Sequence, residues 1–140
     1  MYRIKKRLAL LLLFAFLSAL FAAGCGGSPK LADSFDEDAV KQKAMEAVAL
    51  INARDTDGLK AVCTDTLAAA LTDELTAQIY EEIGAGGAFL EMGDMAALGT
   101  KGENGEDYAV VVALAKYESK TFTFTLSFDT GLKLGGLFYK

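Results

Sequence analysis

The spacing of apolar residues changes once along this chain, and that change limits the folds open to it. Before residue 84, apolar side chains recur at helical spacing, as in Leu75, Ile79 and Ile83. After residue 87 they recur at every second position, most strictly over 121–128. A period of two is typical of a strand with one buried face. Helices followed by strands predict an α+β domain, with N-terminal helices packed on a curved antiparallel sheet of about four strands.

The second half of the chain divides into four expected strands, at 89–100, 108–117, 121–128 and 132–139. Gly93 and Gly99 are the expected bulges or bends of the first strand. Asn104-Gly105 is a strong hairpin signal and separates the first strand from the second. The second strand is apolar on both faces, which predicts a central strand that is covered on both sides.

The alternation also predicts which side chains share a face. In the third strand, one face carries Phe122, Phe124, Leu126 and Phe128, and the other carries Thr121, Thr123, Thr125 and Ser127. If the turn at Glu118-Ser119 has an even number of residues, Ala109, Ala113 and Ala115 lie on the phenylalanine face. Small residues beside large ones would then interdigitate. Val110, Val112 and Leu114 would lie on the threonine face.

The first half predicts several helices and their caps. Ser34 and Glu37 have the spacing of a capping box, which predicts a helix over 35–53. Asp55-Thr56-Asp57-Gly58 resembles the start of an EF-hand loop, but the required Glu at position 12 is Thr66. We therefore interpret it as a turn and N-cap for a short helix. A further short element carries Leu67 and Leu71, and Thr72 caps the helix that contains Leu75. Gly84 to Gly87 closes that helix.

The N-terminal 24 residues have the pattern of a secretory signal. Four basic residues within 3–7 precede an uncharged run of 16 residues, 8–23, interrupted only by Ser18. That run is short for a membrane-spanning helix, which needs about 20 apolar residues. Ala22-Ala23-Gly24-Cys25 resembles a bacterial lipobox. This resemblance implies lipidation of Cys25 and cleavage just before it by signal peptidase II. An ordinary cleavable signal and a transmembrane helix are the alternatives.

We expect three segments from this pattern: a lipoprotein signal peptide at 1–24, the lipidated Cys25 and a flexible tether at 25–33, and a single α+β domain at 34–140. The expected location is the extracytoplasmic side of the cell membrane, in a bacterial envelope. Two or more acyl chains on Cys25 would give a stable anchor, whereas one gives marginal binding.

Charge and composition exclude several classes of function. Residues 25–140 carry 10 Lys and Arg against 19 Asp and Glu, a net charge of 10 − 19 = −9. Such a domain repels nucleic acid, whose binding depends on phosphate neutralisation. The chain has no His, so it has no imidazole ligand or base. We expect no metal and no cofactor. With Cys25 lipidated, Cys63 has no internal partner, and we interpret it as a buried apolar residue.

The predicted domain resembles a known group as a whole. The resemblance spans about 33–140 and is identified as domain of unknown function 3887, found in bacterial lipoproteins, within the nuclear transport factor 2-like superfamily. The segments that carry it are Phe35-Asp36-Glu37 with the helix that follows, 51–55, 71–74, 87–89, 107–112, 122–129 and 136–139. It contains no catalytic motif, and the group has no assigned activity.

The resemblance implies a cone in which helices close one end of a curved sheet around a cavity. The candidate lining residues are Phe89, Tyr108, Phe122, Phe124, Phe128 and Tyr139. The alternative is ordinary core packing, because alternating aromatic residues in strands usually belong to the core.

Three hypotheses about function follow. The first is a non-catalytic domain that binds a small ligand or an envelope protein. The second is a small enzyme of the ketosteroid isomerase type, with an Asp base and a Tyr in the cavity. The only plausible residues for such a site are Asp94, Asp107, Tyr80, Tyr108 and Tyr117. The third, compatible with the first, is a homodimer formed through the sheet face that carries Val110 and Val112.

Overall fold

The computed structural model describes residues 29–140, so the predictions for residues 1–28, Cys25 among them, lie outside the described part. Within it, four helices precede four strands. In chain order they are α2 (Glu37–Asn52), α3 (Thr56–Val62), α4 (Asp65–Ala70), α5 (Asp73–Gly84), β1 (Phe89–Lys101), β2 (Asp107–Tyr117), β3 (Thr121–Phe128) and β4 (Leu134–Tyr139). This confirms the predicted α+β class.

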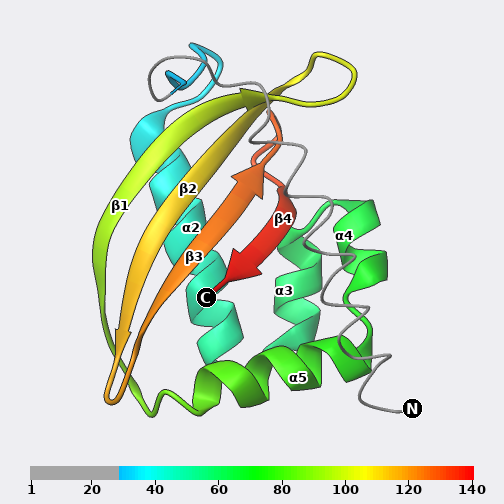
Figure 1. The fold of residues 1–140 in the computed structure, drawn as a ribbon. Helices are drawn as coiled ribbons and strands as arrows, with labels where there is room; N and C mark the ends of the chain where they lie inside the picture. The colour runs from blue at the N-terminus through cyan, green and yellow to red at the C-terminus, as the bar shows by residue number, and fades with distance from the viewer. Residues whose placement is uncertain (1–28) are drawn as a thin grey trace.

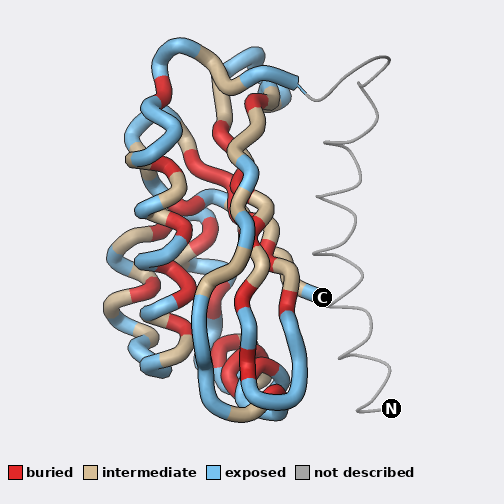
Figure 2. Tube along the Cα trace, turned by 90° about the vertical axis from the view of Figure 1, so that its left-hand side faces the viewer, coloured by how far each residue is buried: buried red, intermediate tan, exposed pale blue. Residues whose placement is uncertain are grey.

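The strands form one antiparallel sheet in the order β1-β2-β3-β4, and the sheet is curved (Figure 1). The helices cover one of its faces, and the buried segments lie mainly between the two layers (Figure 2). β2 lies between β1 and β3, so the prediction of a central strand is confirmed. A helix layer on a curved antiparallel sheet is consistent with a nuclear transport factor 2-like cone.

The register of β2 and β3 confirms the predicted faces. Ala109, Ala113 and Ala115 lie opposite Phe128, Phe124 and Phe122, respectively. These six residues are buried against the helices, and we call this side of the sheet the inner face. Val110, Val112 and Leu114 lie opposite Ser127, Thr125 and Thr123 on the outer face. The three outer-face aliphatic residues are only half-buried, so the prediction of full cover on both sides of β2 is wrong.

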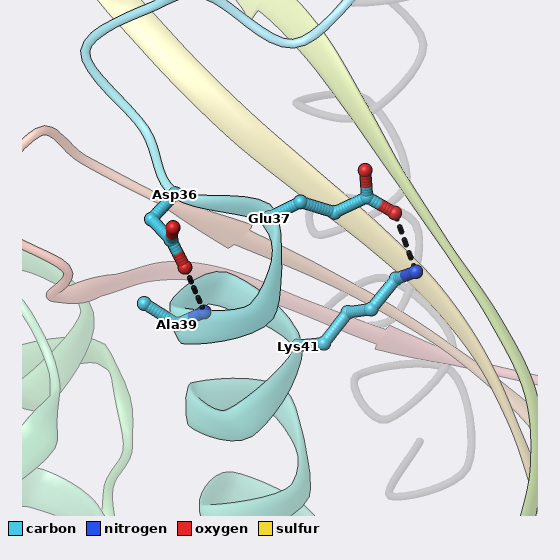
Figure 3. Close-up of polar contacts among 4 residues, drawn as sticks. All are labelled: Asp36, Glu37, Ala39 and Lys41. Atoms are coloured by element: carbon cyan, nitrogen blue, oxygen red, sulfur yellow. Dashed lines mark hydrogen bonds and ion pairs between the residues drawn. The ribbon is translucent and has the colours of Figure 1, made fainter.

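The first helix begins two residues later than predicted. Its N-cap is Asp36, whose Oδ1 accepts a hydrogen bond from the amide of Ala39 at 2.8 Å (Figure 3). The predicted capping box of Ser34 and Glu37 is therefore wrong. Asp caps a helix as well as Ser does. Starting at Glu37 puts Phe35 and Val40, both buried, at the two positions of a hydrophobic staple. Glu37 instead pairs with Lys41 one turn later, at 2.5 Å (Figure 3).

The other caps and turns follow the sequence closely. Asp55, Thr64 and Thr72 cap α3, α4 and α5 through their side-chain oxygens. Gly105 has a φ of +82° in the predicted hairpin turn, and Gly87 has a φ of +87° just after α5. Both values favour glycine. The last strand starts at Leu134 rather than 132, because the amides of Leu132 and Lys133 bond back to Asp129 within the turn.

One of the two predicted bulges is present. The register of β1 on β2 shifts between Met92 and Met95, around Gly93, and again between Phe89 and Glu91. Gly99 instead pairs regularly with Ala109, so the bulge predicted there is wrong. Because Gly99 has no side chain, the backbone of residues 30 and 31 can pack closely against it.

Candidate functional site

The phenylalanines predicted to line a cavity pack against one another in the core. The rings of Tyr117 and Phe122 meet edge to face, with their centroids 5.3 Å apart. Phe124 lies 6.5 Å from Phe122 and 6.1 Å from Tyr139, measured between ring centroids. Phe122, Phe124 and Phe128 are all buried. This row, on the inner face of β3 and β4, fills space between the sheet and the helices.

The other candidate lining residues are not all brought together with this row. Phe89, at the start of β1, is 40% exposed and contacts the ring of Tyr117 at 5.5 Å. Tyr108 lies opposite Thr100 on the outer face of the sheet, since its neighbour Ala109 is on the inner face. The six predicted residues therefore do not surround one space.

A small apolar pocket lies where α4 and α5 meet β4. Its volume is about 30 Å³. Its lining residues come from distant parts of the chain: Leu67, Ala70, Leu71, Leu75, Gln78, Ile79, Leu137 and Tyr139. A space of this size holds a water molecule or two. Pockets that bind drug-sized ligands measure roughly 300–1,000 Å³. It cannot take a metabolite without movement of the surrounding helices.

A second, wide-open depression of about 400 Å³ lies beside the start of β3 and the end of β4. Lys120 places its Nζ 4.5 Å from the centroid of the Phe122 ring, and Tyr139 donates a hydrogen bond to Glu82 at 2.6 Å. Burial, and then the bond to Glu82, raise the pKa of Tyr139. This hydroxyl therefore stays protonated at neutral pH and acts as a donor, not as a base.

The residues of the enzyme hypothesis come from α5, β1 and the two ends of β2, and they are not gathered into one site. Asp107 forms an ion pair with Lys101, and Asp94 is exposed in the irregular part of β1. Tyr80 hydrogen-bonds Thr56 at 3.0 Å, and Tyr117 donates to Asn52 at 2.5 Å. Burial raises the pKa of the Tyr117 hydroxyl, and the bond to Asn52 opposes that rise. These tyrosines link helices to each other and to the sheet, and neither is bonded to Asp94 or Asp107.

The thiol of Cys63 is buried, as predicted. It lies at the end of α3 and donates a hydrogen bond to the carbonyl oxygen of Leu59 at 3.1 Å. Burial raises its pKa from 9.0 to about 11, with a smaller opposing effect from the charge of Lys133. Reactive thiols have lowered pKa values and exposed sulfur atoms. Cys63 has neither property. Across residues 29–140, no group of three Cys, Asp or Glu side chains is arranged to hold a metal ion.

We expect native Cys63 to resist a thiol reagent at pH 8 and to react fully in urea. Because the folded state holds the thiol proton more tightly, its contribution to stability is complete below pH 9 and is lost as the pH rises towards 11. Urea unfolding between pH 8 and 11 measures how much the free energy of unfolding falls. In Cys63→Ala, the part of this fall that comes from the thiol should be absent. Rapid labelling of the folded protein would contradict the buried position.

The register places a run of uncharged residues on the outer face of the sheet. Its central positions are Ala96, Leu98 and Thr100 on β1, Tyr108, Val110, Val112 and Leu114 on β2, and Thr123, Thr125 and Ser127 on β3. We call this set the outer apolar face. Beyond Leu114, near the end of β2, the set is bordered by an ion pair. Lys116 Nζ lies 3.0 Å from Glu91 Oε1 on β1. The sequence placed Val110, Val112 and Leu114 of β2 and the three β3 members on this face, but it assigned Tyr108 to the cavity. It missed the three β1 members, because the bulge at Gly93 breaks the alternation of β1.

No helix in the described range 29–140 is long and apolar enough to cross a membrane. Cys25, the predicted lipidation site, lies outside that range, so its modification stays a prediction.

The fold and its surfaces define a small α+β domain with a filled aromatic core and an apolar sheet face. The chain belongs to the family described as "Protein of unknown function (DUF3887)", whose model matches residues 44–137. It is also similar to a solved structure, "NMR structure of protein from Ruminococcus gnavus ATCC 29149". The two share 26% sequence identity with a TM-score of 0.71, and the match covers 81% of this chain and 99% of that one. No curated protein matches the chain.

Proposed function

We propose that this protein is a lipid-anchored lipoprotein on the extracytoplasmic side of the cell membrane, with a non-catalytic interaction domain of the nuclear transport factor 2-like superfamily. The domain binds a protein partner through the outer apolar face, and that partner is a second copy of the chain. The signal-like segment at 3–23 and the lipobox-like Ala22 to Cys25 support the anchor.

A surface, rather than a cavity, is favoured by how the aromatic residues are used. Phe122, Phe124 and Phe128 are buried among alanines and helix side chains. The small apolar pocket of about 30 Å³ is too small for a metabolite, and the depression of about 400 Å³ beside β3 is wide open. The interaction therefore belongs on the outside of the domain.

The observation that carries the proposal is the uncharged character of the outer apolar face. The described residues carry a net charge of 10 − 19 = −9, so two copies repel each other over most of their surfaces. Across the outer apolar face no position carries a charge, and the half-buried Val110, Val112 and Leu114 run along its centre. An isologous dimer brings the same patch of each copy together. This face therefore permits such contact without opposing charges.

Val112→Glu tests the dimer. Val112 lies between Ala96 and Thr125 at the centre of the outer apolar face. We expect a folded monomer, with self-association weakened by more than about 100-fold, because an unpaired buried charge costs about 3–5 kcal/mol. Sedimentation velocity reports the association, and circular dichroism reports the fold.

The matched variants are Thr121→Glu and Val111→Glu. Thr121 is exposed at the start of β3, outside the outer apolar face, so its variant should still dimerise. Val111 is 0% exposed on the inner face, so its variant should unfold. If Val112→Glu also unfolds, the position is core and the interface is elsewhere. A wild-type monomer at all concentrations rejects the dimer, and a small molecule retained in a native mass spectrum would move the function to a cavity.

A further inference from the structure

The first described residues are attached to the edge strand of the sheet. The amide of Gly99, in β1, donates a hydrogen bond to the carbonyl oxygen of Pro29 at 3.1 Å. Leu31 and Ala32 are half-buried against the core, and the amide of Phe35 bonds to the carbonyl oxygen of Ala32 at 3.0 Å. Residues 29–35 are thus attached to the domain at Pro29, Leu31, Ala32 and Phe35, although the sequence alone predicts a flexible tether to residue 33.

Gly99 makes this attachment possible because it has no side chain. A Cβ atom at this position would lie 2.3 Å from the carbonyl oxygen of Lys30 and 3.2 Å from the Cα of Leu31. A distance of 2.3 Å between a carbon and an oxygen that are not bonded is a steric clash. The carbonyl oxygen of Lys30 is a backbone atom, so it cannot rotate away as a side chain could. Among the strands of residues 29–140, β1 pairs only with β2, on its other edge, so the amide of Gly99 is available to Pro29.

We infer that the link between lipid and domain is only residues 26–28, and that the domain stands with one fixed end towards the membrane. The inference rests on the proposed lipidation of Cys25. Four residue steps separate Cys25 from Pro29, which can span at most about 14 Å. The end nearest the bilayer is the one that holds residues 29–36 and the β1–β2 turn at 102–106 (Figure 1).

The opposite end carries α5 and the β2–β3 turn at 118–120 (Figure 1). Along β1, ten residue steps separate Gly99 from Phe89, or about 33 Å in an extended strand. This exceeds the reach of the link by more than twofold, so the far end cannot take the position next to Cys25. The net charge of −9 also opposes a domain lying flat on anionic headgroups. The inference therefore directs the α5 end away from the bilayer.

Trypsin cleavage after Lys30 tests the attachment without reference to the lipid. In the full-length protein we expect this bond to be cut much more slowly than the same bond in a peptide of residues 26–36. Gly99→Ala should raise the cleavage rate on the order of tenfold, because it displaces the segment and breaks its bond to the strand. Gly135→Ala is the matched control, since a Cβ there meets nothing closer than 3.7 Å. Cleavage of the unaltered protein at the rate of the peptide would overturn the attachment.

Fluorescence quenching in vesicles tests the orientation. Asn104→Cys puts a single reactive thiol in the β1–β2 turn, and Ala85→Cys puts one just after α5; both positions are exposed. Cys25 would be consumed by the lipid, and Cys63 is buried. The labelled, lipidated protein is inserted into phosphatidylcholine vesicles with a quencher on the headgroups. We expect the dye at 104 to be quenched several-fold more than the dye at 85.

Equal quenching at the two sites, or stronger quenching at 85, would overturn the orientation. The intact mass of each sample is measured first. A sample without acyl chains shows failure of the proposed lipidation, whereas an acylated sample with the wrong quenching pattern shows failure of the orientation alone.

Discussion

Replacing Cys25 with alanine is expected to abolish lipid attachment completely. The thiol is the atom that would carry the diacylglyceryl group, and alanine has no substitute for it. The variant should incorporate no labelled fatty acid. It should also keep residues 1–24, because the lipobox resemblance implies cleavage that follows lipidation. Metabolic labelling with a fatty acid and the intact mass of the purified chain measure the two effects.

Cys63→Ala is the matched control for this experiment, because it removes the other of the chain's two cysteines. It should be labelled and cleaved like the unaltered protein. Fatty acid in the Cys25→Ala protein would assign the modification to another residue. Wild-type protein that is released from membranes after cleavage, with no lipid mass, would favour an ordinary signal peptide. Wild-type protein that keeps residues 1–24 without lipid would favour the transmembrane alternative for residues 8–23.

The sheet could be predicted from the sequence because its signals are local. The alternation over 121–128 gives the two faces of β3, and a short turn fixes the register of β2 beside it. Once the parity of that turn is known, Ala113 must lie near Phe124 and Val112 near Thr125. Both pairings are present. Helix caps at Asp55 and Thr72 are equally local, since each side chain bonds an amide three residues later.

The errors occur where tertiary contacts choose between local options. Ser34 and Asp36 are both good caps, and the burial of Phe35 favours the second. A glycine in a strand indicates a bulge or a close approach of another backbone, and the sequence does not say which. Gly93 takes the first role and Gly99 the second. The partner of Gly99 lies about 70 residues earlier in the chain.

The candidate site was less predictable than the fold. The lining of the small pocket combines Leu67 and Ile79 with Leu137, and no pattern in the sequence joins these positions. The expected cone cavity grouped Phe89 and Tyr108 with the phenylalanines of β3. Their positions depend on strand register and on where the helices end. Tyr108 lies on the other face of the sheet, and Phe89 is partly exposed to solvent at the start of β1.

Phe124→Ala is expected to cost about 3–5 kcal/mol of the free energy of unfolding, the usual effect of removing a fully buried ring. Phe124 is 0% exposed and lies among Phe122, Tyr139 and the Ala113 strand position. Domains of this size are stable by only about 5–15 kcal/mol, so the variant should be marginal at room temperature. Urea titration followed by circular dichroism measures the loss.

Phe89→Ala is the matched control, because the same ring is removed from a position 40% exposed to solvent. It loses one edge-to-face contact with Tyr117, worth about 0.5–1.5 kcal/mol, and leaves no enclosed space. The cavity left by Phe124→Ala should be apolar and dry, and should therefore bind xenon or benzene and recover part of the lost stability. If Phe124→Ala is instead as stable as Phe89→Ala, the phenylalanine row borders an existing space. The interior would then be a ligand site, and the interaction surface would no longer be needed to explain the domain.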